Sequence, residues 1–121
     1  MSLKFTNFDN YILIESPKGM DYWEIIEGIP KLISMPEFKN KNDIWVFISG
    51  QIKMAYTDLN AIKNLVEEIC PVNSKGSKTA IVTKNDFQQT YGKLYSDICK
   101  DLQRKIKIFS DLKSAEDWII E

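Results

Sequence analysis

The chain has 121 residues, 44% of them hydrophobic and 27% charged, which is typical of one globular domain and excludes a disordered, collagenous or disulfide-scaffold protein. Its 16 basic residues are balanced by 17 acidic ones, so no positive field favours nucleic acid or anionic lipid. Histidine is absent, which excludes histidine general bases, Ser–His and Cys–His nucleophile pairs, and imidazole metal sites. We expect a single domain over residues 1–121.

The first part of the chain predicts a β-hairpin followed by a helix. Residues 3–5 and 11–14 have strand-like patterns and are separated by a short turn. From about residue 20 to 35, apolar residues recur at helical spacing. Pro30 lies inside this stretch and predicts a kink or a split into two short helices.

The rest of the chain alternates strand patterns with helix patterns. The polar stretch 37–43 predicts a surface connection, and the run 44–48 is apolar on both faces, as in a central strand covered by helices on both sides. The further elements are a helix from Thr57 or Asp58, a strand at 79–83, a helix capped by Asn85 or Asp86, a strand at 105–109 and a helix capped by Ser110 or Asp111. This alternation predicts an α/β fold with a mixed, mostly parallel sheet flanked by about four helices.

Membrane-spanning and secretory segments are not expected. The uninterrupted apolar runs at 11–14 and 44–48 are far shorter than the roughly eighteen residues of a transmembrane helix. Residues 1–8 lack the apolar stretch and the cleavage site of a secretory signal. A cytoplasmic location is therefore the default expectation.

Motifs for catalysis and for metal or cofactor binding are also missing. No spacing of the glycines matches a P-loop or a dinucleotide-binding loop. Cys70 and Cys99 lie in helical patterns, where a small buried hydrophobe is the commoner role, and two thiols without histidine make a poor zinc site. We therefore expect a protein that is not an enzyme, with no catalytic residues, no metal and no cofactor.

The order of the elements and the ending of the chain resemble a known family. The ending has a strand, a phenylalanine, a short turn with an aspartate, and then an alanine and a tryptophan before an aliphatic residue, here Phe109, Asp111, Ala115, Trp118 and Ile119. This pattern is similar to the SpoIIAA-like family, whose STAS-type domains are related to the CRAL-TRIO lipid-binding fold. The resemblance implies one domain of this type, with Ala115 allowing close approach of the last helix to the sheet and Trp118 covering the sheet.

The resemblance implies a bacterial regulatory domain that binds a partner protein through the loop after the central strand. In anti-sigma factor antagonists of this family, a serine at the start of the following helix is phosphorylated by the partner kinase. The hydroxyl that matches it here is that of Thr57, and the aspartate that precedes the family's serine is missing. Capping of the helix by Thr57 or Asp58 is the plainer interpretation of the same residues.

Large apolar side chains near this loop also point to a partner surface. Met54 and Tyr56 must either fold inward or remain exposed as a contact patch, and Trp23 would extend that patch if it points outward. With Thr57 and Asp58 they form the predicted partner-binding site. The partner is an unidentified protein, a second copy of the chain included.

A carrier of a small apolar or lipid-like ligand is the alternative function. Tyr91 and Tyr95 lie four residues apart in a helical stripe and could line a ligand pocket or form plain core; the stripe comprises Phe87, Tyr91, Leu94, Tyr95, Ile98 and Leu102. A carrier is expected to contain an enclosed apolar pocket of roughly 300 Å³ or more. A contact module is expected to have a filled core and an exposed apolar patch.

Overall fold

The computed structural model describes residues 3–69, 77–102 and 104–121. The main sheet contains β1 (Lys4–Asn7), β2 (Tyr11–Ser16), β4 (Asn42–Phe47), β6 (Lys78–Val82) and β7 (Lys105–Phe109), in that spatial order. A short second sheet pairs β3 (Met20–Asp21) with β5 (Ile52–Lys53). The helices are α1 (Tyr22–Ser34), α2 (Asp58–Ile69), α3 (Asp86–Ile98) and α4 (Leu112–Ile119), with a 3₁₀ helix η1 (Pro36–Asn40) after α1.

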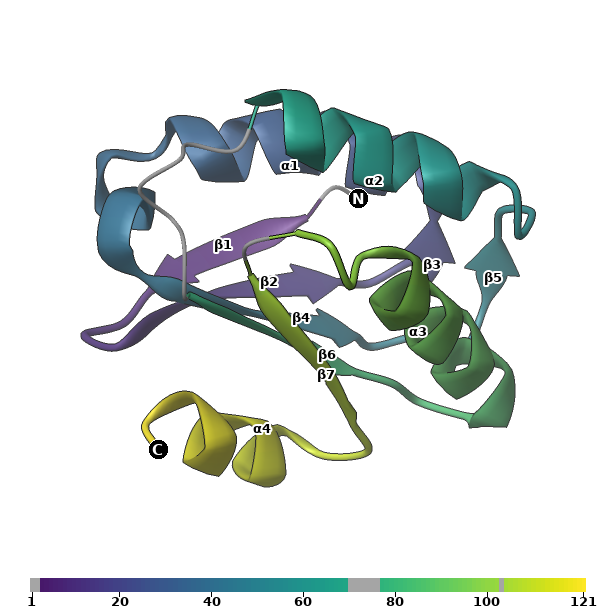
Figure 1. Ribbon diagram of the computed structural model, residues 1–121. Coiled ribbons are helices and arrows are strands. Elements are labelled where there is room, and N and C mark those ends of the chain that lie inside the picture. Colours follow the sequence, from purple (N-terminus) through teal and green to yellow (C-terminus); the bar gives the residue numbers. More distant parts are fainter. Residues whose placement is uncertain (1–2, 70–76, 103) are drawn as a thin grey trace.

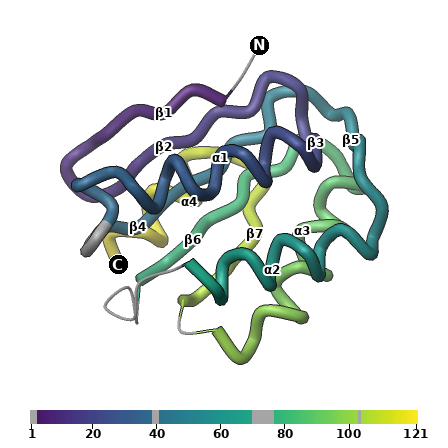
Figure 2. The backbone as a smooth tube through the Cα atoms, turned by 90° about the horizontal axis from the view of Figure 1, so that it is seen from above, coloured from purple at the N-terminus to yellow at the C-terminus, as the bar shows by residue number. Residues whose placement is uncertain are grey.

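The architecture confirms the predicted α/β fold. β1 and β2 form an antiparallel hairpin, and β2, β4, β6 and β7 are parallel. Because each new parallel strand is added on the same side of the previous one, the connecting helices α1, α2 and α3 all fall on one face of the sheet (Figure 1). Figure 2 shows α1 and α2 side by side over the sheet, while α4 covers the opposite face.

Each face of the sheet has its own apolar core. Under α1–α3 the buried residues are Ile12, Ile14, Met20, Ile25, Ile29, Leu32, Phe38, Trp45, Phe47, Leu59, Ile62 and Ile81. Under α4 they are Tyr11, Leu13, Ile44, Ala80, Val82, Ala115 and Ile119. Successive residues of a strand point to opposite faces, so β4 is apolar on both sides, as predicted for a central strand.

The residues that carry the resemblance lie in the last strand and the last helix, which packs on the sheet. Asp111 caps α4, and its carboxylate accepts a hydrogen bond from the Ser114 N–H at 2.8 Å. Ala115 is fully buried against the sheet. The ring of Trp118 lies 5.7 Å from that of Phe109, with the Lys78 ammonium 5.1 Å from its centre.

Of the two outcomes predicted at Pro30, a kink or a split of the first helix, the split is wrong. α1 is one helix with Pro30 inside it, and its N-terminus is capped by Asp21, whose carboxylate accepts from the Glu24 N–H at 3.1 Å. Pro30 is exposed, so the core does not have to accommodate its ring. Continuous packing of the apolar face outweighs the one helical hydrogen bond that proline cannot make.

The polar stretch 37–43 is not simply a surface connection. Phe38 in η1 is buried, and β4 begins at Asn42, so that Asp43 is a buried strand residue. An aspartate inside a strand is unfavourable unless it finds a partner in the fold, and here it does.

The third helix departs from its predicted stripe. Asn85 caps α3 as predicted, but Phe87 and Leu94 are exposed because α3 lies at the edge of the sheet over β7 and has only one covered side. Gln88 follows the cap inside the first turn of α3. Its side chain is fully buried, accepts from the Lys84 N–H at 2.8 Å and donates to two loop carbonyls.

None of the described helices is long and apolar enough to cross a membrane. Cys70, and Pro71 after it, lie outside the described residues. The placement of that cysteine in a helix is therefore still a prediction.

Candidate functional site

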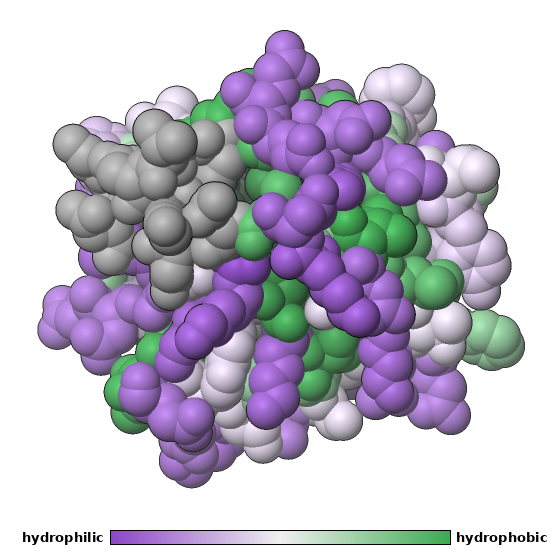
Figure 3. All heavy atoms as spheres, viewed as in Figure 1, coloured by the Kyte–Doolittle hydropathy of each residue, from purple (hydrophilic) through white to green (hydrophobic). Residues whose placement is uncertain are grey.

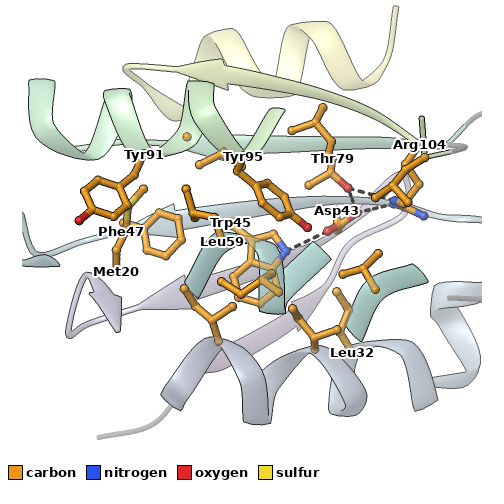
Figure 4. Close-up of a pocket in the computed structure, with 18 of the residues that line it drawn as sticks. Met20, Leu32, Asp43, Trp45, Phe47, Leu59, Thr79, Tyr91, Tyr95 and Arg104 are labelled. Carbon is orange, nitrogen blue, oxygen red and sulfur yellow. Dashed lines mark hydrogen bonds and ion pairs between the residues drawn. The ribbon is translucent and has the colours of Figure 1, made fainter. Parts of the chain in front are cut away.

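A cavity of about 100 Å³ lies in the core between the sheet and helices α1, α2 and α3 (Figure 4). Most of its wall is apolar and includes Met20, Leu32, Trp45, Phe47, Leu59 and Ile62. A cavity of roughly 150 Å³ with such a wall is known to hold a benzene molecule. The cavity is thus smaller than the pocket expected of a carrier, yet it is large enough to show that this core is not filled.

The apolar lining continues toward one side of the molecule. In Figure 3, hydrophobic residues are visible below α2 and beside α3, framed by hydrophilic ones. Val66 of α2 and Ile106 of β7 are cavity residues that are only half-buried. The wall of the cavity therefore reaches close to the surface at these two elements.

One end of the cavity is polar (Figure 4). The Asp43 carboxylate accepts hydrogen bonds from Arg104 Nη2, from Thr79 Oγ1 at 2.8 Å and from Trp45 Nε1 at 2.9 Å. The side chains of Asp43 and Arg104 are only 5% and 7% exposed, so they form a buried ion pair. Such a pair is stable only while both partners are present, because either charge alone would be buried without compensation.

The Arg104 guanidinium is held on several sides. Nε donates to Thr79 Oγ1 at 3.0 Å, Nη2 donates to Asp43 and to the Lys78 carbonyl, and the Phe38 ring centre lies 5.1 Å from the guanidinium carbon. Nη1 is buried and has no hydrogen-bond partner among the described residues. A buried donor without a partner costs free energy, and a hydrogen-bond acceptor placed beside it would remove that cost.

The two tyrosines singled out from the sequence both line the cavity. The Tyr91 hydroxyl donates to the Met54 carbonyl at 2.9 Å, whereas the Tyr95 hydroxyl points toward Asp43 (Figure 4). Burial raises the pKa of Tyr91, and it raises the pKa of Tyr95 well above its usual range. Both hydroxyls are therefore protonated near neutral pH and can donate a hydrogen bond.

Cys99 lies just after α3 and is almost fully buried. Burial raises the pKa of its thiol to about 11, so the thiol is protonated near neutral pH and is a poor nucleophile. Its placement matches the small buried hydrophobe predicted from the sequence.

The loop between β5 and α2 separates its two large apolar side chains. Met54 is half-buried and lines the cavity, whereas Tyr56 is 54% exposed. The Tyr56 ring stacks on that of Tyr91 with 4.5 Å between centres. Met54 therefore folds inward and Tyr56 stays exposed, so each of the two predicted arrangements applies to one residue. Tyr91 contacts both of them.

Thr57 and Asp58 differ from the predicted helix cap. α2 begins at Asp58, and the Asp58 carboxylate accepts from the Ala55 N–H at 2.8 Å, which closes the loop rather than capping the helix. Thr57 is exposed and contributes its carbonyl to the Asn60 N–H at 3.2 Å. The Thr57 side chain is therefore accessible to a partner.

Three aromatic residues are exposed where the helices above the sheet begin. Trp23 in the first turn of α1 is 69% exposed, and Phe87 in the first turn of α3 is 74% exposed; Tyr56 precedes α2. Each of these helices begins shortly after a strand ends. All three aromatic residues therefore lie near the carboxyl ends of the parallel strands. Trp23 points outward, which is the orientation that would extend the predicted patch. Phe87 was placed in the buried stripe of its helix, so its exposure was not predicted.

The polar end of the cavity was also missed from the sequence. Asp43 was assigned to a surface connection, and neither Thr79 nor Arg104 was given a role. The ion pair joins positions 61 residues apart, so no local pattern reveals it. One signal was available, since Arg104 is the only arginine among the 16 basic residues. Arginine differs from lysine most in its planar guanidinium, which can form several hydrogen bonds at once in a buried ion pair.

Within residues 3–69, 77–102 and 104–121, no three cysteine, aspartate or glutamate side chains gather as metal ligands would. No family model matches the chain, and no curated protein or solved structure is significantly similar to it. The function is therefore argued from the cavity and the exposed residues themselves.

Proposed function

We propose that the chain is a non-enzymatic binding domain that holds one small, mostly apolar molecule in the cavity between the sheet and α1–α3. The observation that carries the proposal is the cavity of about 100 Å³ with an apolar wall and one polar end. Protein interiors are close-packed, and unfilled volume in a core costs stability. A ligand that fills this volume accounts for its presence.

The size of the cavity narrows the alternative of a lipid-like ligand. About 100 Å³ is about two thirds of the roughly 150 Å³ of a cavity that takes one benzene ring, and it is well below the size of pockets that enclose larger ligands. We therefore favour a small cyclic or branched molecule over an acyl chain.

Methyl NMR of the wild-type protein tests this function. Methylenecyclohexane, a small cyclic hydrocarbon, is expected to shift the methyl signals of cavity residues such as Met20, Ile62 and Leu59 while leaving Leu13 and Ile119 under α4 unchanged. Leu59→Phe is the matched control, because the larger side chain occupies part of the cavity and should weaken binding. Absence of any saturable shift in the wild type, both with this hydrocarbon and with its ketone counterpart cyclohexanone, would refute the proposal.

A regulatory role through protein contact, as in STAS-type domains of bacteria, is the second candidate. It is supported by the exposed rings of Trp23, Tyr56 and Phe87, since aromatic side chains are enriched in protein interfaces. The exposed Thr57 beside Tyr56 is where a phosphate would change the fit of a partner. Tyr56 stacks on a cavity residue, so an occupied cavity and a bound partner would affect each other.

Parallel pull-downs with wild type, Tyr56→Ala and Phe8→Ala test this second function. Phe8 is an exposed aromatic residue in the β1–β2 turn, at the other end of the sheet, and serves as the control. A partner retained by Phe8→Ala and lost by Tyr56→Ala would support the contact role, and Thr57→Glu should weaken the same partner. Identical captured proteins in all samples would remove it.

A further inference from the structure

We propose that the ligand of this cavity is an uncharged molecule that carries a hydrogen-bond-accepting oxygen, such as a small cyclic ketone, and that Arg104 Nη1 donates to that oxygen. This inference rests on the proposed ligand-binding function and extends it to the chemical class of the ligand.

The first argument is the unused donor. The Arg104 side chain is 7% exposed and lines the cavity, and its Nη1 is buried with no hydrogen-bond partner in the described part of the chain. The other guanidinium nitrogens are engaged by Asp43, Thr79 and the Lys78 carbonyl. These bonds and the nearby Phe38 ring hold the guanidinium in place, so Nη1 cannot turn to solvent. An acceptor that enters the cavity removes the cost of the unpaired donor.

The second argument concerns charge. The positive charge of Arg104 is already balanced by Asp43, so the polar end of the cavity is neutral as a whole. A carboxylate or phosphate ligand would place a second negative charge beside Asp43 in an apolar environment, which is costly. A ketone oxygen accepts the hydrogen bond without adding charge.

The surroundings of the Arg104 side chain also fit an uncharged ligand with one polar oxygen. The Tyr95 hydroxyl points toward the same end of the cavity (Figure 4), and it is protonated near neutral pH. The rest of the wall is apolar, and the cavity volume of about 100 Å³ limits the ligand to a small molecule. The cavity thus matches an apolar body with one polar oxygen.

The test compares two probes of nearly identical shape, cyclohexanone and methylenecyclohexane, on wild type and on Arg104→Lys. Lysine can keep the ion pair with Asp43 but has no second nitrogen to offer the cavity. The ratio of the two dissociation constants, hydrocarbon over ketone, is expected to fall about tenfold or more in Arg104→Lys. Using this ratio cancels the different hydration of the two probes.

A second readout uses the wild type alone and stays informative if Arg104→Lys fails to fold. Because Arg104 is the only arginine, its side-chain N–H signals are unambiguous in a ¹⁵N spectrum. Cyclohexanone is expected to shift them in a saturable way, and methylenecyclohexane to shift them much less. Cyclopentanecarboxylate, the anionic probe, is expected to bind more weakly than the ketone.

The outcomes separate the two proposals. If neither the ketone nor the hydrocarbon binds the wild type, the ligand-binding function itself fails. If both bind, with an unchanged ratio in Arg104→Lys or with equal shifts of the arginine signals, a donor already satisfied by water is indicated and only the ligand class is overturned. Tightest binding by the carboxylate would overturn the uncharged class.

Discussion

The two faces of the sheet use the same strands but are packed in different ways. Under α4, Ala115 is fully buried against the strands and belongs to a cluster of buried apolar side chains. Under α1–α3, three helices span a wider layer and leave a cavity with a buried ion pair at one end. The molecule therefore has a packed face and a hollow face.

This difference indicates that the two faces contribute differently to stability. A cavity and a buried charge pair both lower the stability that the same volume of apolar packing would give. In the proposed function both features serve the binding of a ligand, and the packed face under α4 contributes stability that the hollow face gives up.

The largest effect is expected from Asp43→Ala on the hollow face. The change leaves the Arg104 guanidinium buried without its counter-charge, and we expect the free energy of unfolding to fall by about 3 to 5 kcal/mol. Urea unfolding followed by circular dichroism measures it. Asp117→Ala on α4 is the control, because it removes an exposed ion pair and should leave the urea midpoint almost unchanged. Equal midpoints for both variants would show that the pair at the cavity is not structural.

Alkaline pH should act on the hollow face next. Burial raises the pKa of Cys99 from 9.0 to about 11, so between these values the unfolded chain releases a proton that the folded chain keeps. Stability should therefore fall as the pH rises from 9 to 11, by at most about 3 kcal/mol from this thiol, and Cys99 should not affect the pH dependence below that window.

The measurement is the pH dependence of urea unfolding in a reducing buffer for wild type and Cys99→Ala. The variant should lose less stability than wild type between pH 9 and 11. Tyr11 on the packed face adds its own loss of stability between pH 10 and 12 in both proteins alike, because burial and the Glu116 carboxylate raise its pKa from 10.0 to about 12. Parallel curves for the two proteins would contradict the prediction.

Enlarged side chains should have opposite effects on the two faces. Ala115→Leu forces extra volume into the packed face and should cost about 2 kcal/mol. Leu59→Phe adds volume beside the cavity and should keep the stability within about 1 kcal/mol of wild type. Thermal unfolding of the two variants makes the comparison directly. A larger loss for Leu59→Phe would mean that the cavity is not accessible to added side-chain volume.

The smallest effect is expected at the start of α3, above the hollow face. Asn85 caps this helix by accepting from the Gln88 N–H at 2.9 Å, and its amide donates to the Gly50 carbonyl at 3.0 Å. Asn85→Ala should lower the free energy of unfolding by about 1 kcal/mol. Asn64→Ala on the exposed side of α2 makes the same chemical change away from a cap and should be close to neutral.

Local patterns in the sequence predicted most of the secondary structure. Apolar periodicity gave the type and order of the strands of the main sheet and of all four helices, and cap residues such as Asn85 and Asp111 gave two helix starts. The short β3–β5 pair was missed because it has only two residues in each strand and no periodicity to read. Tyr91 and Tyr95 were correctly singled out as residues that could line a pocket, but the size of that pocket was not predictable.

The sequence alone determined the α/β class, the hairpin and the predominance of parallel strands, because these follow from periodicities within ten to fifteen or so residues. The pairing of Asp43 with Arg104, the different exposure of Met54 and Tyr56, and the cavity on one face of the sheet became visible in the folded molecule alone. The physical reason is that these features depend on contacts between distant segments and on the volume left between packed helices, which no local pattern contains.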